Sequence, residues 1–348
     1  MQIYFVLTVD YEVFGDGSGC IENCVIKPAE KIMGIAEEFN IPITFFVDVL
    51  EFIVMENCLE TKKDVLKVKK QLRNAILKGH DVQLHLHPQW KGAYWEEGKG
   101  WHVNMAKWRV GDLPYEEILK LLKQGKSWLE NLLKPVRSDY KCVAFRAGDW
   151  CIQPSANVIR ALKKIKIQID STVAPGIKNY SPDEWSDFSY APKLPYWKIN
   201  NDVCEPSKDG IWEVPITTAS IGIIKHFKIL FNHFFIQKQK FASGCSGSYK
   251  GPGGLLGNIK GKLMKLTKLG KVMLDLCTIP ERMLRFVILQ WIEKVNNRCN
   301  KILPIVAIAH TKNFTCYSEE SLCNFLKWLK MNNIKPITFP HLVEVFED

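Results

Sequence analysis

Short runs of apolar and β-branched residues alternate with amphipathic helical patterns along most of this chain, and no other feature constrains its fold as much. A repeated order of strand and helix implies parallel strands joined by crossover helices. The chain has 348 residues, which suits a closed barrel better than an open doubly wound sheet. No GxGxxG sequence follows the first strand, as a dinucleotide-binding sheet would need. We therefore predict a (β/α) barrel.

Eight strands and five helices are expected in this barrel. The strands are short and apolar, and they cover Ile3–Val9, Ile43–Val47, Val82–His87, Cys142–Arg146, Ile167–Asp170, Trp212–Ile216, Leu303–Ile308 and Pro336–Phe339. The helices have an amphipathic pattern, and they cover Pro28–Phe39, Lys62–Lys78, Pro114–Leu133, Pro154–Lys164 and Glu319–Lys330.

The alternation breaks between about residues 221 and 301, where the positive charge of the chain is concentrated. This segment holds 15 Lys and Arg against 3 Asp and Glu, a net charge of +12, while the whole chain carries +10. A loop rich in Gly and Ser covers residues 243–254, and helices are expected at Lys262–Leu276 and Glu281–Val295. We predict a first barrel part at 1–220, a basic helical insertion at 221–300 and the closing barrel elements at 301–348.

This basic segment, residues 221–301, has two interpretations that the sequence leaves open. It can face an anionic membrane surface or the phosphates of a substrate carrier, because large apolar residues are interleaved with its lysines. It can equally be a set of helices with solvated Lys faces. No groove-reading motif is present, so no nucleic-acid partner is expected.

Composition and the first residues indicate a globular protein of the cytosol. Apolar residues make up 47% and charged residues 24% of the chain, and no run of about 18 apolar residues is present. The segment Met1–Asp10 lacks the basic start and small-residue cleavage site of a signal peptide, and it is expected to form a buried strand. The 11 cysteines include no CxxC pair, so free, mostly buried thiols are expected. We predict a cytoplasmic location, with peripheral contact at the inner membrane face if the basic segment binds lipid.

Polar pairs at the ends of two strands point to a metal site. Asp10 and Glu12 end the first strand, and His85 and His87 end the third. Side chains two apart on a strand share a face, and barrel active sites lie where strands end. Two histidines and a carboxylate around an open position suit a hydrolytic zinc or a similar divalent ion. Polar core residues satisfied by hydrogen bonds are the alternative.

Two further strand ends carry candidate catalytic groups. Arg146 closes the fourth strand, where a buried guanidinium needs a carboxylate partner. His310 follows the apolar run 303–309 and is a natural proton donor, although a capping or packed histidine is the alternative for this residue alone. The long loop 88–111 contains four tryptophans and suits substrate contacts.

In their order along the chain, four motifs together resemble the polysaccharide deacetylase family (NodB homology, carbohydrate esterase family 4). They are Leu7-Thr8-Val9-Asp10-Tyr11-Glu12, Gln83-Leu84-His85-Leu86-His87-Pro88, Phe145-Arg146-Ala147-Gly148-Asp149-Trp150 and Ile308-Ala309-His310-Thr311. The resemblance implies a distorted (β/α)₇ barrel, a divalent metal that is usually zinc, and removal of acetyl groups from N-acetylated sugars.

The same resemblance assigns the metal ligands and the base. Asp10 matches the catalytic base, Glu12 the metal-binding carboxylate and His85 the first metal-binding histidine. The family's second histidine comes four residues later, where this chain has Gln89. His87 is therefore predicted as the second histidine ligand, on strand geometry.

The remaining roles follow in the same way. Arg146 matches the arginine that orients the base, and His310 matches the general acid. The backbone N–H near Tyr11 is expected to stabilise the oxyanion, Trp150 to form an aromatic wall, and Asp170 is a candidate for the poorly matched fourth motif. The expected substrate-contacting residues are Tyr11, Trp90, Asp149, Trp150 and Asp170.

The sequence thus predicts a metal-dependent carbohydrate N-deacetylase acting on a glycan or on a nucleotide- or lipid-linked precursor. Two alternatives remain. A glycoside hydrolase also uses paired carboxylates, but those flank one bond at about 5 Å or more, and the histidines would have no role. A non-catalytic carbohydrate-binding barrel would be expected to lack a base, an acid or a ligand.

Overall fold

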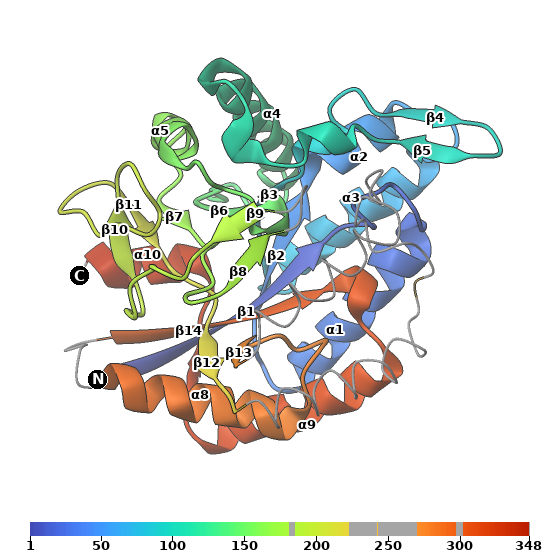
Figure 1. The fold of residues 1–348 in the computed structure, drawn as a ribbon. Helices are drawn as coiled ribbons and strands as arrows, with labels where there is room; N and C mark the ends of the chain where they lie inside the picture. The colour runs from blue at the N-terminus through green and yellow to red at the C-terminus, as the bar shows by residue number, and fades with distance from the viewer. Residues whose placement is uncertain (181–184, 223–241, 243–269, 297–301, 348) are drawn as a thin grey trace, which may run out of the picture.

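The computed structural model describes residues 1–180, 185–222, 242, 270–296 and 302–347, and it shows a curled, mostly parallel sheet surrounded by helices (Figure 1). Eight described strands form the path β10-β11-β7-β6-β3-β2-β1-β14, and β15 pairs with β1. Only β10 and β11 pair antiparallel in this sheet. The strands are β1 (Gln2–Tyr11), β2 (Ile43–Asp48), β3 (Asp81–Leu86), β6 (Ala144–Ala147), β7 (Ile169–Asp170), β10 (Trp197–Ile199), β11 (Ile211–Glu213), β14 (Ile302–His310) and β15 (Lys335–Pro336).

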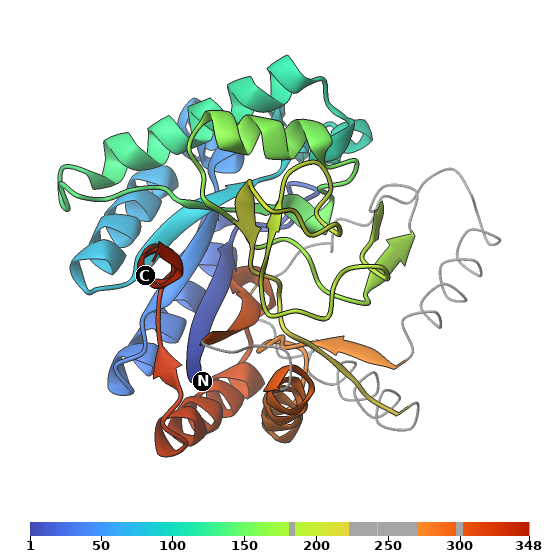
Figure 2. The same cartoon turned by 90° about the vertical axis from the view of Figure 1, so that its left-hand side faces the viewer.

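Helices cover the outer face of this sheet, as Figure 2 shows. All the barrel helices expected from periodicity are present, with ends shifted by a few residues. The described α-helices are α1 (Lys27–Glu38), α2 (Val49–Glu56), α3 (Lys62–Leu77), α4 (Tyr115–Leu133), α5 (Ala156–Lys164), α8 (Glu281–Asn296), α9 (Cys316–Met331) and α10 (Phe339–Glu347). None of them is both long and apolar enough to cross a membrane.

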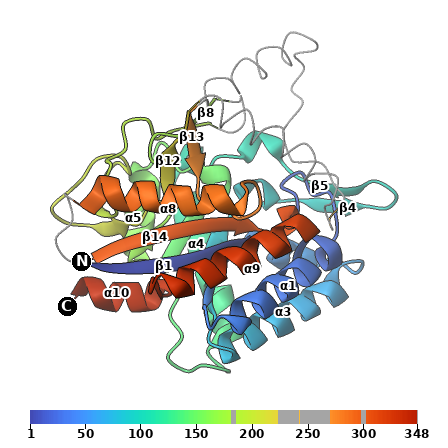
Figure 3. The same ribbon diagram turned by 90° about the horizontal axis from the view of Figure 1, so that it is seen from below.

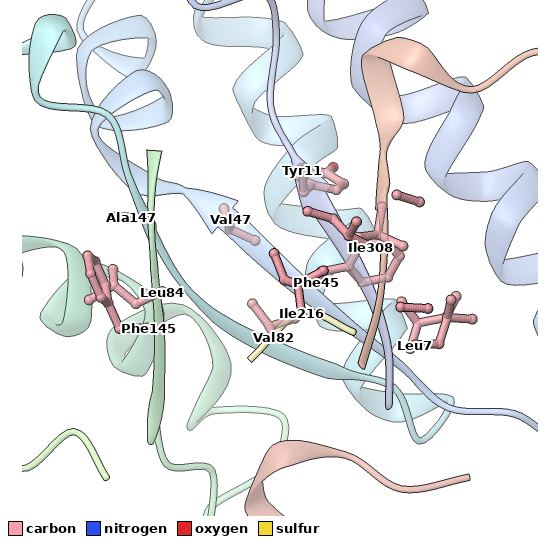
Figure 4. Packing of buried hydrophobic residues seen from close by; sticks show 14 of the residues in the cluster. Leu7, Tyr11, Phe45, Val47, Val82, Leu84, Phe145, Ala147, Ile216 and Ile308 are labelled. Atoms are coloured by element: carbon pink, nitrogen blue, oxygen red, sulfur yellow. The ribbon is translucent and has the colours of Figure 1, made fainter. Parts of the chain in front are cut away.

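Alternation along the strands separates the outer core from the barrel interior. Leu7 and Tyr11 of β1 and Val47 of β2 belong to the large buried cluster between sheet and helices (Figure 4). The intervening residues of β1, such as Tyr4 and Val6, belong to a second cluster inside the barrel. This division follows from the two-residue period of a strand.

Helix α10 closes the amino end of the barrel. Phe339 and Leu342 are fully buried against the interior cluster, and the Phe339 ring lies 5.5 Å from the Phe46 ring. Inward-facing residues nearer the carboxyl ends of the strands are polar, beginning with Thr8 and Arg146. The interior is therefore apolar at one end and polar at the other.

Irregular segments connect the two sides of the curled sheet. The backbone N–H of Thr217, beyond β11, donates to the carbonyl of Val306 in β14 at 3.0 Å. The N–H of Leu276 donates to the Ile308 carbonyl at 2.8 Å, and the N–H of Ile308 donates to the Leu274 carbonyl at 2.9 Å. The barrel is distorted because these segments, and not a regular strand, join β11 to β14.

Short antiparallel pairs complete the fold. The aromatic loop forms the hairpin β4 (Tyr94–Glu96) and β5 (Gly100–His102), which projects from the body in Figure 1. The other described pairs are β8 (Lys178–Tyr180) with β9 (Trp185–Asp187), and β12 (Thr218–Ser220) with β13 (Lys271–Met273).

The described part of the basic segment confirms one predicted helix and contradicts the other. Helix α8 (Glu281–Asn296) confirms the helix expected at Glu281–Val295. The expected helix Lys262–Leu276 is wrong from residue 270 onward, because Lys271–Met273 pairs with β12 as a strand. Residues 223–241 and 243–269, with the predicted Gly/Ser loop, lie outside the described residues. Helix α8 packs against α9 and β14 in the outer layer, as Figure 3 shows. The predicted domain boundaries remain untested.

The described cysteines are all free, but fewer are buried than expected. Of nine described cysteines, four are buried: Cys24, Cys142, Cys151 and Cys277. Cys20 and Cys316 are exposed. The prediction of mostly buried thiols is therefore wrong for the described residues, because several cysteines lie in loops and at helix starts.

Candidate active site

Three side chains from the ends of β1 and β3, the two strands on either side of β2, converge at the carboxyl end of the barrel. The Oε2 atom of Glu12 lies 2.8 Å from Nε2 of His87 and 3.7 Å from Nε2 of His85. The two Nε2 atoms are 3.1 Å apart, and all three residues are buried. The structure thus brings together the predicted ligand set.

The donor atoms fit a tetrahedral metal. Nδ1 of His85 lies 2.8 Å from the carbonyl oxygen of Arg146 and donates to it, which leaves the Nε2 lone pair facing Glu12 and His87. Two nitrogens bound to one zinc at about 2.0–2.1 Å lie roughly 3.3 Å apart, close to the separation found here. Two imidazole nitrogens that face each other need a cation or a proton between them, so this arrangement suits a bound metal.

The charge around these donors also fits a cation. Glu12, Asp10, Asp48 and Glu51 are buried carboxyl groups in this region, and their described positive neighbours are Arg146 and Lys312. Burial raises the pKa of Asp48 to about 6, and burial together with Asp48 and Glu12 raises the pKa of Glu51 well above its usual range. Buried carboxyl groups thus outnumber the Lys and Arg side chains beside them, and a divalent ion held here would favour the ionised form of each.

Arg146 holds Asp10 as an ionised, aligned carboxylate. Its Nη1 lies 2.6 Å from Oδ1 of Asp10 and 2.9 Å from the Thr8 hydroxyl, and Nε donates to the Ser171 carbonyl at 2.9 Å. Burial acts to raise the pKa of Asp10, but Arg146, His85 and His310 outweigh it and hold the pKa below its usual value. A carboxylate kept ionised in this way can act as a general base.

His310 lies beside the same carboxylate. Its Nε2 is 3.4 Å from Oδ2 of Asp10, and the register of β1 and β14 places the two residues directly opposite each other. The Trp150 ring packs edge-on against the His310 ring with centroids 6.2 Å apart. Base and acid candidates are therefore neighbours, and each of the two oxygens of Asp10 has a different partner.

The far side of the His87 ring is tightly enclosed. Nε2 of Gln89 lies 2.9 Å from Nδ1 of His87, so Gln89 contacts the nitrogen that faces away from Glu12. A Cβ atom at Gly148 would lie 2.6 Å from the His87 ring, so no larger residue fits there. The Trp108 ring packs edge-on against the same imidazole. Gln89 thus orients His87 from behind and lies outside the converging donor group.

A strained loop forms part of the rim. Asp149 and Trp150 both have positive φ, 47° and 58°, which is uncommon for consecutive non-glycine residues. This conformation places Oδ2 of Asp149 3.5 Å from Nδ1 of His87 and Trp150 against His310. Both residues predicted from this motif are therefore at the site.

Three predicted substrate contacts have side chains elsewhere. Tyr11 points into the outer core, and its hydroxyl donates to Gln71 at 2.8 Å, because alternation turns it away from Asp10 and Glu12. Trp90 is fully buried against Trp101 beneath the β4–β5 hairpin. Asp170 is buried beside Thr172 and Glu213, outside the group around Glu12. The backbone role predicted near Tyr11 stays a prediction.

Sequence reasoning missed three charged residues at this site. Nζ of Lys312 lies 2.9 Å from Oε1 of Glu12. Burial acts to lower the pKa of Lys312, but the charges of Glu12 and Asp149 together outweigh it and raise the pKa. Asp48 ends β2 and accepts from the His87 N–H at 3.3 Å. Glu51 accepts from the N–H of Val13 at 3.0 Å. The strand-end rule could have found Lys312 and Asp48, whereas Glu51 lies in a helix that the sequence did not signal.

Comparisons with known proteins give structural matches alone. No family model and no curated protein matches the chain. A protein assigned as a polysaccharide deacetylase from Mycobacterium smegmatis is 13% identical over 98% of this chain and 88% of its own, with a TM-score of 0.50. A peptidoglycan deacetylase from Bacillus subtilis is 11% identical over 99% and 92%, with a TM-score of 0.39. A CE4 family pseudoenzyme from Bacillus anthracis is 10% identical over 98% and 65%, with a TM-score of 0.42.

At these identities the first of these likenesses shows the fold and nothing finer. The predicted distorted β/α barrel is confirmed, both by the sheet and by this solved structure. The chain shares the barrel-like fold of the Mycobacterium smegmatis protein.

Proposed function

We propose that this protein is a metal-dependent hydrolase that removes the N-acetyl group from a sugar. The observation that carries the proposal is the convergence of Glu12, His85 and His87 beside an Asp10 that pairs with both Arg146 and His310. The barrel fold shared with a protein assigned as a polysaccharide deacetylase supports the reaction class.

Glu12, His85 and His87 would hold the metal. When bound, a zinc or similar ion supplies Lewis acidity and lowers the pKa of water. Lys312 binds Oε1 of Glu12 and leaves Oε2 toward the histidines, so it acts as a positioning residue for this ligand. His85 is fixed by its bond to the Arg146 carbonyl and His87 by Gln89, so each imidazole has a defined orientation.

Hydrolysis of the amide needs one proton taken from water and one given to the amine. Asp10, kept ionised by Arg146, takes the proton from the attacking water. His310, in its protonated form, donates to the departing nitrogen, which gives acetate and an amino sugar. Because Oδ2 of Asp10 lies 3.4 Å from Nε2 of His310, the proton gained by Asp10 can pass to His310 and restore both groups.

The geometry speaks against a glycoside hydrolase. Both oxygens of Glu12 are engaged, Oε1 by Lys312 and Oε2 by the histidines, so this carboxylate is not free to act as a nucleophile or acid on a sugar bond. The remaining alternative is a non-catalytic carbohydrate-binding barrel, and the assay below distinguishes it.

The substrate and the location remain predictions. A nucleotide- or lipid-linked glycan precursor in the cytoplasm is the expected substrate, and the charge of the basic segment supports a carrier phosphate or an anionic membrane face as its contact. Failure of vesicles rich in acidic lipid to retain the protein at low salt would exclude the membrane contact.

The activity is tested by acetate release from N-acetylhexosamine compounds with zinc-loaded protein. Asp10→Asn and His310→Ala should each lower kcat by about 10²–10⁴-fold while metal content is unchanged. Asp209→Asn, at an exposed site, is the matched control and should retain activity. A metal-loaded wild type that binds acetylated sugars but releases no acetate would show a binding protein.

Metal content tests the ligand assignment separately. His85→Ala and His87→Ala should lose bound metal, whereas Gln89→Ala should retain it at reduced affinity, because Gln89 contacts the outer nitrogen of His87. Full occupancy in His87→Ala with loss in Gln89→Ala would reverse the assignment.

A further inference from the structure

A second cavity, separate from the active-site cluster, lies between α8, the β12–β13 pair and the loop after β7. Its volume is about 510 Å³, within the size range of small-molecule sites. None of Asp10, Glu12, His85, His87 or His310 lines it. Its polar and charged lining residues are Lys193, Lys271, Lys294, Ser189, Thr218 and Ser220.

Three lysines make this cavity strongly positive. Burial and then the charge of Lys193 lower the pKa of Lys271, and burial, Lys271 and Lys193 lower the pKa of Lys294. Among the residues that the structure describes, none of the three forms an ion pair with a carboxylate within 4.0 Å. Nζ of Lys294 donates to Oε1 of Gln290 at 3.0 Å, and Glu293 attracts Lys294 only weakly. The three ammonium groups are thus close enough to repel one another, and no described carboxylate pairs with them.

A buried donor also faces no acceptor here. Trp291 lines the cavity, is 4% exposed, and its Nε1 has no hydrogen-bond partner in the described part of the chain. A buried N–H without an acceptor is unfavourable, so an acceptor beside it in the cavity would stabilise the site.

The walls that hold these groups are fixed. The amide of Gln290 pairs with both backbone groups of Ser220, at 2.7 and 3.0 Å, and ties α8 to β12. A Cβ atom at Gly176 would lie 3.2 Å from Nζ of Lys271, so the glycine lets this lysine lie against the loop after β7. The hydroxyl of Ser189 donates to Asp187 at 2.5 Å, and that of Thr218 to the Pro175 carbonyl at 2.8 Å.

We propose that this cavity binds the phosphoryl group of a small molecule, as a pyrophosphate or a phosphate monoester. Three ammonium groups and an indole N–H offer donors from several directions, which suits a compact anion with several oxygens and more than one negative charge. The inference stands on the cavity and its donors, not on the proposed hydrolysis, so binding is measured without any turnover.

Calorimetric titration of the full chain at low salt tests the proposal, with inorganic pyrophosphate, inorganic phosphate and a nucleoside diphosphate as probes. One site per chain is expected. Lys271→Gln and Lys193→Gln should each weaken pyrophosphate binding by about tenfold or more, because each removes a charge-assisted hydrogen bond. Trp291→Phe should weaken it by a smaller factor. Lys193 lies on the surface, so its variant is expected to fold normally.

Lys208→Gln, an exposed lysine outside the cavity, is the matched control for charge and should bind as the wild type does. Equal weakening by Lys208→Gln and Lys271→Gln would show general attraction to a basic protein and overturn the proposal. Absence of binding at millimolar pyrophosphate would also overturn it. So would retention on phosphatidate-containing vesicles without binding of any soluble probe, because recognition would then belong to a membrane surface.

Discussion

Arg146 shows at the residue scale how one buried charge organises its surroundings. The side chain has no exposed surface, yet its nitrogens contact Asp10, Thr8 and the Ser171 carbonyl, and its carbon Cζ lies 4.2 Å from the centre of the Phe46 ring. A buried guanidinium is stable only when its donors are used in this way. The residue therefore fixes Asp10 and supplies, through its own carbonyl, the bond that orients His85.

A second buried acidic pair lies away from the metal ligands. Asp170 and Glu213 are fully buried on paired strands, and a side-chain hydrogen bond joins their carboxyl groups. Burial raises the pKa of Asp170 to about 6, and burial together with Asp170 raises that of Glu213 well above its usual range. The folded protein therefore keeps protons on this pair at pH values where the same carboxyl groups are ionised in the unfolded chain.

This pair predicts a stability that falls as pH rises. The unfolded chain releases these protons near pH 4 and the folded protein only from about pH 6 upward, so stability is lost progressively across that interval and above it. Glu213→Gln removes one acid and gives Asp170 an amide donor. At pH 8 its free energy of unfolding, measured with urea, should exceed that of the wild type by roughly 1–3 kcal/mol, and at pH 5 the two should differ little. Glu205→Gln, at an exposed site, is the control. A Glu213→Gln variant less stable at pH 8 would contradict this account.

Helix α10 shows how an element distant from the chemistry supports it. Phe339 packs on Phe46, whose ring lies beneath Arg146, which in turn holds Asp10. Helix α10 at the amino end of the barrel is thus connected to Asp10 at the carboxyl end through Phe46 and Arg146. The sequence analysis did not predict this helix, because the strand expected at Pro336–Phe339 extended into its first residue.

Removing the Phe339 ring from α10 should lower the stability of the protein without removing a metal ligand. Phe339→Ala deletes a fully buried ring and should cost about 3–5 kcal/mol in the free energy of unfolding. Metal content should remain that of the wild type, because none of the three ligands touches the helix. Glu344→Ala, on the exposed face of the same helix, is the control. Urea unfolding and metal analysis measure the two quantities, and a loss of less than 1 kcal/mol would show that α10 is not part of the barrel core.

For the whole molecule, metal binding and folding stability are linked. The site assembles from β1, β3 and the end of β14, which are far apart in sequence, so the unfolded chain cannot present it. Zinc at about 100 times its Kd should add about 2.7 kcal/mol to the free energy of unfolding. Chelation should remove this gain and lower the unfolding temperature.

Glu12→Gln separates this linkage from general ion effects. The variant lacks the ligand carboxylate, so zinc should leave its unfolding temperature unchanged, while Glu344→Gln should respond as the wild type does. Calorimetric scans with and without chelator measure the difference. An equal response of wild type and Glu12→Gln would place the bound metal elsewhere.

The sequence by itself determined the local order of strands and helices and the polar residues at the strand ends. All eight expected strands are present within a few residues, because short β-branched runs and helical periodicity are properties of neighbouring residues. The i, i+2 spacing likewise determined that Asp10 and Glu12 share a face, as do His85 and His87.

Only the tertiary structure decided which of these groups meet. The pairing of β14 with β1 brings His310 to Asp10 and Lys312 to Glu12 across about 300 residues. The same folding leaves Asp170 beside Glu213 instead of at the site. Such contacts depend on strand order and on the curl of the sheet, and these are set by packing of the whole core and not by any local pattern.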